Sequence, residues 1–385
     1  MSSPPGAIAA TQRTRTLRVL RGAHEVPRAA WDALARRGYH RHAWFVANES
    51  CGAQARHVAV YENDALIAIV PAYIERETLH GDLHARWYGP LHAVASAFGV
   101  GLRPSLAIGA PMSSGSDLLG ADSALTESVI DSALDLLEAE ARAANAKAIV
   151  WPFVNEQSRA AREVARRRGY LESFANSEAV LDVAWSSAEQ YVASQSKSVR
   201  RTLRQELAWV SENGVRVTWE NDLEPLAAEL DALYRASYAV RNGHPPALAP
   251  SFFATLALQR SPGVRVQCAR RNGELLEMAV ALDCGGALDL CLSAQSNETR
   301  NGLLYQYCLC YDPVRDAIAN GVSRIHLGPS ALYPKVLRGA RLARRVTLVR
   351  GCTAPARAAL RVLAPAVGAR NEAKQRRRLA AMQSQ

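Results

Sequence analysis

Long apolar runs are missing from this sequence of 385 residues. The apolar stretch Ala65–Tyr73 stops at Glu75 and Arg76, well short of the roughly 18 to 20 residues that a membrane-spanning helix needs. The stretch up to Ala10 lacks the charged start and the long apolar segment of a secretion signal. We therefore expect a cytoplasmic protein with no membrane span.

Several motifs of common catalytic and metal-binding sites are also missing. The sequence has no Gly-x-Ser-x-Gly elbow, no P-loop and no dinucleotide fingerprint, which argues against hydrolases and kinases. Its 7 cysteines follow neither zinc-site nor disulfide-scaffold spacing. No carboxylate or cysteine completes a metal site around His80, His84 and His92. We predict free, mostly buried thiols and no bound metal.

Positive charge, in contrast, is in excess. The formal net charge is +10, which favours polyanionic partners such as coenzyme A, a transfer RNA or an anionic envelope precursor. The alternative is a solvated basic surface without a specific partner. The length exceeds what one hydrophobic core usually serves, so we expect two domains.

The apolar periodicity predicts the same plan of elements twice. In the first half we expect strand, strand, helix, strand, helix and strand, over residues 56–61, 65–73, 124–143, 148–151, 159–168 and 178–183. In the second half we expect helices and strands over residues 226–234, 264–268, 275–282, 287–292, 301–320 and 323–327. Asp122 or Ser123 is the expected cap of the 124–143 helix.

This order is typical of an α/β fold with a mixed sheet, and specifically of duplicated GNAT-like acyltransferase domains. A serine-rich stretch around residues 184–198 is the expected connection. We place the first domain at residues 1–185, the second at residues 186–350, and a basic C-terminal tail at residues 351–385. From about Asn371 on, the tail is either a solvated helix or a frayed segment.

A basic helix start follows the connection. Leu203, Leu207 and Val210 share one face of a helix, and its first two turns carry Lys197, Arg200, Arg201 and Arg204. Arginine side chains and a helix N-terminus both suit a phosphate or pyrophosphate, so we assign these four cations to donor binding. The alternative is a solvated face whose cations pair with acids such as Glu206.

A second set of candidates surrounds the strand at residues 323–327. This strand ends in Gly328-Pro329-Ser330, and a loop at that edge of a sheet is a common ligand site. Tyr305 and Lys335 are the predicted catalytic residues there, since they can protonate a leaving thiolate or hold an acyl carbonyl. Ser330 and Tyr333 are assigned to donor binding. The alternative is a surface loop with a buried tyrosine.

An attacking amine must also lose a proton, which calls for a base. The second hairpin carries the carboxylates Glu277, Asp283 and Asp289. Strand alternation places Glu277 and Asp283 on the same face, so we name these two as catalytic candidates.

Several of these motifs resemble known families. The run Lys197–Arg204, followed by Glu212-Asn213-Gly214-Val215, is similar to the basic helix that opens the BioF2-like acetyltransferase domain. Gly302-Leu303-Leu304-Tyr305 with its long helix is similar to the same domain. The Cys310-Tyr311 helix and the ending Lys335-Val336-Leu337-Arg338-Gly339 resemble the FemAB-like family of the GNAT superfamily, relatives of the Fem ligases.

The resemblance implies a tandem GNAT fold that transfers an acyl or aminoacyl group to an amine, or sometimes a hydroxyl, of a small molecule or envelope precursor. Tyr333 and Pro334 stand where the FemAB-like ending has an acidic residue and a histidine. The pyrophosphate loop of ordinary acetyl-CoA enzymes is also missing. We therefore expect acetyl-CoA or another acyl-CoA as donor, with an aminoacyl-tRNA as the alternative. A non-catalytic module that binds RNA or envelope is the third possibility.

Overall fold

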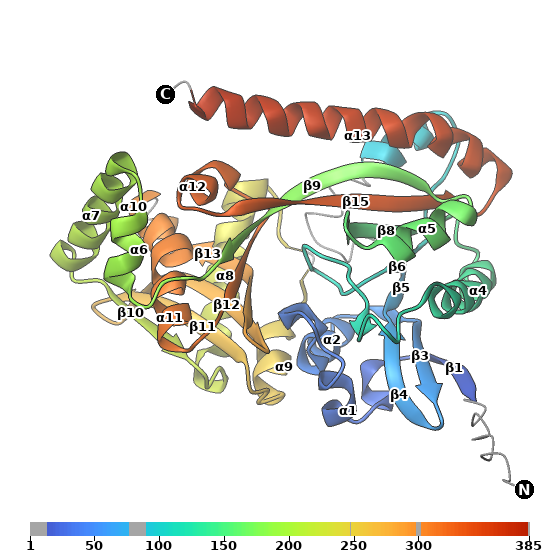
Figure 1. The fold of residues 1–385 in the computed structure, drawn as a ribbon, viewed down its shortest axis with the longest axis horizontal. Coiled ribbons are helices and arrows are strands. Elements are labelled where there is room, and N and C mark those ends of the chain that lie inside the picture. Colours follow the sequence, from blue (N-terminus) through green and yellow to red (C-terminus); the bar gives the residue numbers. More distant parts are fainter. Residues whose placement is uncertain (1–13, 77–89, 247, 298–301, 384–385) are drawn as a thin grey trace, which may run out of the picture.

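The computed structural model describes residues 14–76, 90–246, 248–297 and 302–383. The first and second halves of the sequence lie at opposite ends of an elongated body, and two long strands run between them (Figure 1). No helix in the described part of the chain has the length and apolar character needed to cross a bilayer. His80 and His84 lie outside the described residues.

A small antiparallel sheet forms one side of the first half. Its strands follow the order β1-β3-β4-β7 and comprise β1 (Arg15–Leu20), β3 (His57–Glu62), β4 (Ala65–Val70) and β7 (Leu119–Gly120). The hairpin between β3 and β4 is confirmed, with Asn63 and Asp64 at positive φ. The prediction of a single strand over residues 65–73 is wrong. Pro71 separates β4 from β5 (Ala72–Glu75), which joins the second sheet, because proline cannot donate a ladder hydrogen bond.

An 11-stranded mixed sheet joins the two halves. Its order is β10-β11-β12-β13-β14-β9-β15-β8-β6-β5-β2. The bounds are β10 (Arg216–Glu220), β11 (Val264–Arg271), β12 (Glu274–Cys284), β13 (Ala287–Gln295), β14 (Arg324–Gly328), β9 (Leu171–Asp182), β15 (Arg341–Gly351), β8 (Ala148–Asn155), β6 (Ser105–Ile108) and β2 (Gln54–Ala55). The mixed α/β fold expected from the sequence is confirmed.

One parallel pair occurs in each half, β6 with β8 and β13 with β14. The β13–β14 pairing covers only Ala287–Asp289 against Arg324–His326, and the two strands separate beyond it. The expected boundary near residue 185 falls in the irregular connection after β9. However, β15, from the second half of the sequence, pairs with both β8 and β9.

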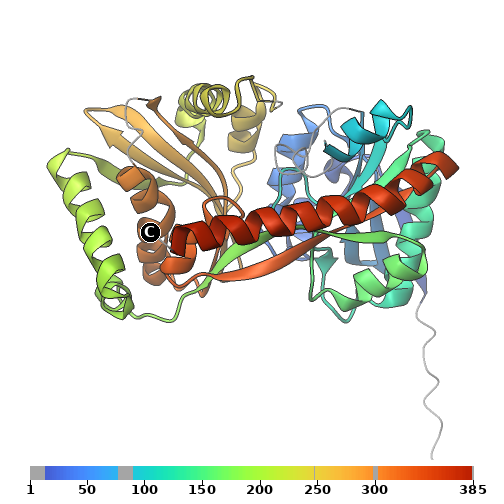
Figure 2. The same cartoon turned by 90° about the horizontal axis from the view of Figure 1, so that it is seen from above.

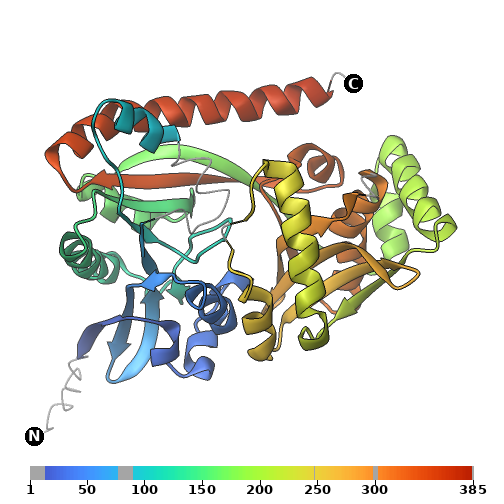
Figure 3. The same ribbon diagram turned by 180° about the vertical axis from the view of Figure 1, so that it is seen from behind.

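Helices cover the sheets in both halves (Figures 1 and 3). The first half contains α1 (Arg28–Asp32), α2 (His42–Glu49), α4 (Glu127–Ala143) and α5 (Arg159–Arg167). The second half contains α6 (Ala188–Ser194), α7 (Lys197–Glu212), α8 (Ala227–Asn242), α9 (Phe252–Leu258), α10 (Gly302–Gln306), α11 (Asp312–Ala319) and α12 (Leu332–Leu337). A π-helical turn, Tyr307–Tyr311, interrupts the long helix expected at residues 301–320. One hydrophobic cluster includes Trp44 of α2 and Phe252 of α9, so the two halves share core packing.

The cap of α4 differs from the expectation. Neither Asp122 nor Ser123 caps this helix, because Thr126 is the N-cap and its side-chain oxygen accepts a hydrogen bond from the Val129 amide. Asp122 instead pairs with Arg36. We expect Thr126→Ala to lower the free energy of unfolding by about 1 kcal/mol, measured by urea denaturation. Asp122→Ala is the comparison, and an equal or larger loss there would contradict this assignment.

The C-terminal segment forms one long helix, α13 (Ala354–Gln383). Of the two alternatives for the residues after Asn371, the structure therefore shows the helix. It lies along β9 and β15 and crosses the molecule over both halves (Figure 2). Ala356, Leu360 and Ala364 on its inner side are buried, so the segment is packed against the sheet rather than detached.

Candidate functional site

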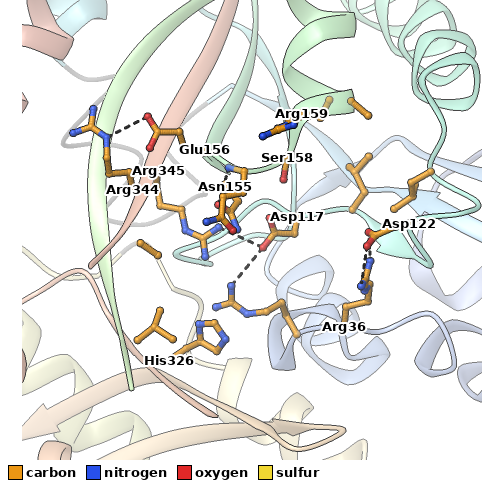
Figure 4. Close-up of a pocket in the computed structure, with 18 of the residues that line it drawn as sticks. Arg36, Asp117, Asp122, Asn155, Glu156, Ser158, Arg159, His326, Arg344 and Arg345 are labelled. Atoms are coloured by element: carbon orange, nitrogen blue, oxygen red, sulfur yellow. Dashed lines mark hydrogen bonds and ion pairs between the residues drawn. The ribbon is translucent and has the colours of Figure 1, made fainter. Parts of the chain in front are cut away.

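A cavity of about 700 Å³ lies where the two halves meet. Its walls come from β8, β9, β14 and β15, together with the loops around residues 36–37, 117–122 and 155–159. Arginines are frequent among the lining residues, and they are Arg36, Arg37, Arg159, Arg324, Arg341, Arg344 and Arg345. Figure 4 shows Arg345 and Asp117 meeting above His326 within this cavity.

A buried charge cluster forms part of the cavity wall. We call it the Arg37 cluster, and it consists of Arg37, Asp117, Glu178, Asp289 and Arg345. Arg37 Nη2 lies 2.9 Å from Glu178 Oε1, and its Nε lies 3.1 Å from Asp289 Oδ1. Arg345 Nη2 pairs with the other oxygen of Glu178, while Asp117 lies 3.4 Å from Arg37 and 3.5 Å from Arg345. The two arginines therefore hold carboxylates from three separate parts of the chain.

Neighbouring polar groups complete this cluster. The Ser114 hydroxyl donates to Glu178 Oε1 at 3.0 Å, and the Gly38 amide donates to Asp289 Oδ2 at 2.6 Å. His326 Nδ1 lies 3.4 Å from Glu178 Oε1. Because Gly38 packs directly on the Leu282 backbone, the loop that carries Arg37 is fixed against β12.

The arginines lower the pKa of two carboxylates in this cluster, Glu178 and Asp117. Burial alone would raise the pKa of Glu178, but the guanidiniums of Arg37 and Arg345 hold that pKa well below its usual range. The pKa of Asp117 is lowered in the same way, against its burial, by Arg345 and Arg37. A carboxylate with a strongly depressed pKa is a weak base, so Glu178 and Asp117 are suited to position the arginines and not to accept a proton.

Three members of this region could be read as metal ligands. Ligand atoms of Glu178, Asp289 and His326 lie within 4.8 Å of one another. Both carboxylates already bind guanidinium groups, and a divalent cation would have to enter beside two positive charges. The donor set in the described part of the chain is thus better suited to arginine than to a metal ion.

Four of the predicted site residues come together at the end of β14. Lys335 on α12 is 2% exposed, and its Nζ donates hydrogen bonds to the carbonyl oxygens of Leu327 and Ser330. Burial lowers the pKa of Lys335 to about 8, while the Cys310 thiol and the Glu178 carboxylate oppose that shift. Leu327, whose carbonyl accepts a hydrogen bond from Lys335, follows His326, which lines the cavity.

Tyr305 contacts Ser330, which also contacts Lys335, and Glu277 acts on Tyr305. Burial raises the pKa of Tyr305 to about 12, with contributions from Cys310 and Glu277, and a hydrogen bond with the Ser330 side chain opposes the rise. Glu277 is 1% exposed, and neither of its carboxyl oxygens has a hydrogen-bond partner among the described residues. Burial holds the pKa of Glu277 well above its usual range, so burial favours the protonated, neutral form of this side chain. We call Glu277, Tyr305, Ser330 and Lys335 the Lys335 group.

The other residues predicted on β12 and α12 lie outside this group. Asp283 is partly exposed, six residues along β12 from Glu277, a separation of about 20 Å on a strand. Its carbonyl oxygen accepts a hydrogen bond from Arg41. Tyr333 is half-buried on α12, two residues before Lys335.

The four cations predicted for donor binding lie on α7, and none of them lines the cavity. Lys197, Arg201 and Arg204 are exposed, whereas Arg200 is partly buried and donates to the Gln195 carbonyl. Helix α7 packs against α10, which carries Tyr305. Glu206 does not pair with these cations, because it is buried and pairs with Arg338 of α12. Burial raises the pKa of Glu206 to about 6, against the effect of Arg338.

Sequence reasoning missed most of the Arg37 cluster. Asp289 was considered as a base, but Arg37, Asp117, Glu178 and Arg345 were not singled out. One signal in the sequence was a charged residue next to an apolar strand segment. Glu178 directly precedes Ala179-Val180-Leu181 in β9, and Arg345 directly precedes Val346 in β15. A charged residue inside an apolar strand needs a buried partner.

Comparisons with known proteins agree with this architecture. The model of a family described as FemAB-like, peptidoglycan biosynthesis/recognition, matches residues 22–361. No curated protein matches the sequence.

Solved structures of similar fold cover most of the chain. FemX has a TM-score of 0.57 at 13% identity, over 84% of this chain and 96% of its own. The C-terminal domain of a protein assigned as a lysylphosphatidylglycerol synthetase from Agrobacterium fabrum has a TM-score of 0.56 at 12% identity, over 88% and 95%. A tandem GNAT protein from the clavulanic acid biosynthesis pathway has a TM-score of 0.51 at 12% identity, over 88% and 99%. At such low identity these likenesses establish the tandem GNAT-like fold.

Proposed function

Because the chain belongs to the FemAB-like family, described as peptidoglycan biosynthesis/recognition, we propose that it transfers an acyl group from an acyl-CoA to an amine of an anionic envelope precursor. The observation that carries this proposal is the position of the Lys335 group. It lies at the end of β14, where β13 and β14 separate, and Lys335 bonds the carbonyl of Leu327, the residue after His326 of the cavity wall. Donor and acceptor sites would thus be neighbours.

The cavity is the proposed acceptor site. Its rim carries Arg36, Arg159 and Arg324 beside Arg341 and Arg344. Arginine forks bind phosphate and carboxylate groups in a bidentate manner. Several rim arginines already form exposed ion pairs with acids, such as Arg344 with Glu156 and Arg324 with Asp182. An anionic ligand would replace these acids as the partner of the arginines.

The Lys335 group would supply proton transfers. The amine nitrogen forms a bond to the donor carbonyl carbon, and the carbon–sulfur bond of the thioester breaks. Tyr305 is protonated at neutral pH and gives its proton to the departing thiolate. Lys335 in its neutral form takes the surplus proton of the amine, and exchange of protons with solvent then returns Tyr305 and Lys335 to their starting forms. Glu277, a neutral acid, can donate a hydrogen bond to the developing oxyanion.

Aminoacyl-tRNA is the alternative donor. It is favoured by the exposed cations of α7, which packs against α10, and by the similarity to FemX in fold. The same proton transfers would then serve a ribose hydroxyl as the leaving group. Both kinds of donor are made inside the cell, so we propose that the reaction takes place there.

A thermal-shift comparison tests the donor. We expect acetyl-CoA or a longer acyl-CoA at 100 times its dissociation constant to stabilise the protein by about 2.7 kcal/mol, because a ligand that binds only the native state raises its stability. Stabilisation by charged tRNA alone, abolished by ribonuclease and weakened by salt, would select the alternative donor. A stable protein that responds to neither donor would overturn the transferase proposal and favour a binding module.

A further inference from the structure

The exposed side of α13 concentrates positive charge. The helix carries one acid, Glu372, and its cations are all exposed, namely Arg357, Arg361, Arg370, Lys374, Arg376, Arg377 and Arg378. Among the described residues, Arg376 forms an ion pair with Glu372 at 3.5 Å, and the other six cations form none with an acid. The remaining positive charges have no acidic neighbour to neutralise them within the described part of the chain.

The opposite side of α13 is fully occupied by the sheet. Ser173 donates to the Ala364 carbonyl at 2.6 Å, and the Gln375 amide donates to Ser177 Oγ at 2.9 Å. A side chain at Gly368 would clash with Ser173 Oγ, which would lie 2.7 Å away. This close contact fixes the rotation of the helix, so the cations are held outward and cannot turn toward the protein.

Large apolar side chains are exposed beside these cations. Val362 on α13 is 72% exposed. Residues 90–97 form a short helix that packs on α13, with Leu91 and Ala95 in the same cluster as Leu360. The end of that helix exposes Phe98 by 81% and Val94 by 43%. Unburied apolar side chains thus occur on α13 itself and on the helix that packs against it.

We propose that this side of the protein, the α13 face (Phe98, Val362, Arg370, Lys374 and Arg377), binds the surface of an anionic lipid bilayer. Lipid headgroups would attract the cations, and Phe98 and Val362 would enter the interface. RNA would also bind the cations, but burial of the aliphatic Val94 and Val362 would add nothing to its binding free energy. The proposal concerns a separate surface and does not depend on the transferase reaction.

The α13 face also has a direct connection to the cavity. Glu372 accepts a hydrogen bond from Arg344 Nη1 at 3.0 Å, and Arg344 lines the cavity. A bilayer that binds α13 would therefore lie next to a residue of the cavity wall. This arrangement suits an acceptor that is itself attached to the membrane.

Vesicle sedimentation of the full chain tests the proposal. We expect binding to vesicles of equal parts phosphatidylglycerol and phosphatidylcholine, and little binding to phosphatidylcholine alone. The double variant Arg370→Glu/Arg377→Glu should weaken binding by at least about 30-fold, since each cation near an anionic surface contributes about 1 kcal/mol. Binding should also fall at about 1 M salt, where the screening length is about 3 Å.

Matched variants distinguish binding through the α13 face from an effect of net charge alone. Arg142→Glu/Arg216→Glu changes the net charge equally at exposed positions on α4 and β10 and should leave vesicle binding within about twofold of the parent. Phe98→Ala should weaken binding, whereas Leu258→Ala, at a residue 65% exposed on α9, should not. Equal effects of the two charge pairs would overturn the proposal. So would an Arg370/Arg377 variant that loses binding to a structured RNA and retains binding to the vesicles.

Discussion

Replacement of Lys335 by methionine is expected to lower turnover by about 10²- to 10⁴-fold, the usual contribution of a positioned acid or base. Methionine fills the buried space of Lys335 without its charge, and burial of an ammonium group is unfavourable. The melting temperature should therefore change little, because loss of the hydrogen bonds to the Leu327 and Ser330 carbonyls offsets this gain. Steady-state kinetics and thermal unfolding of the same preparations measure the two effects.

The pH profile adds a readout that a purely structural role would not change. The buried Lys335 has its pKa lowered to about 8, so its neutral form increases as the pH rises toward that value. We expect kcat/KM to rise with pH and to level off above about 8, and we expect Lys335→Met to abolish this dependence. Tyr305→Phe should lower turnover as well, because the phenol proton is lost.

Lys147→Met is the matched control, since Lys147 lies in the loop between α4 and β8, away from both groups of site residues. It should retain normal kinetics. If Lys335→Met lost stability and activity in equal measure, or kept its activity, the assignment of Lys335 to the reaction would be refuted.

Replacement of Arg345 by methionine is expected to give the largest loss of stability, about 3 to 5 kcal/mol. Glu178 and Asp117 would then be left buried with Arg37 as their remaining guanidinium partner. Urea denaturation at neutral pH measures the change. Glu163→Gln, which breaks an exposed pair with Arg166, is the control and should be close to neutral.

The stabilisation by this cluster should also depend on pH. The pKa of Glu178 is depressed in the folded state, so its contribution is present above the ordinary carboxyl pKa and is lost as the pH falls through the folded-state value. The acid sensitivity of Arg345→Met should therefore be smaller than that of the parent protein. An unchanged acid-unfolding profile, or a stability loss no larger than that of Glu163→Gln, would show that the cluster contributes little.

Local patterns in the sequence were sufficient for most elements. The apolar periodicity predicted α4, α5 and α7, and the turn at Asn63 and Asp64 predicted the hairpin of β3 and β4. These features depend on residues that lie close together in the sequence. Pro71 was also visible, and it was a sufficient reason to divide the strand expected there.

The site could be predicted in part for the same reason. Lys335 and Ser330 lie within one loop and helix, so their proximity follows from a short stretch of sequence. Arg37 and Asp289 are 252 residues apart, and no local pattern indicates that they meet. The alternative in which Glu206 pairs with the α7 cations is wrong, because Glu206 pairs with Arg338, which follows α12 and is 132 residues away in the sequence.

The long strands β9 and β15 restrict how the two halves can move. Hydrogen bonds join them from Arg341 opposite Val180 to Val349 opposite Leu171, and the sheet continues without interruption on both sides. A hinge between the halves would have to break this ladder. We therefore expect ligands to enter through movements of loops and side chains at the rim of the cavity, while the continuous sheet holds the Lys335 group and the Arg37 cluster at a fixed separation.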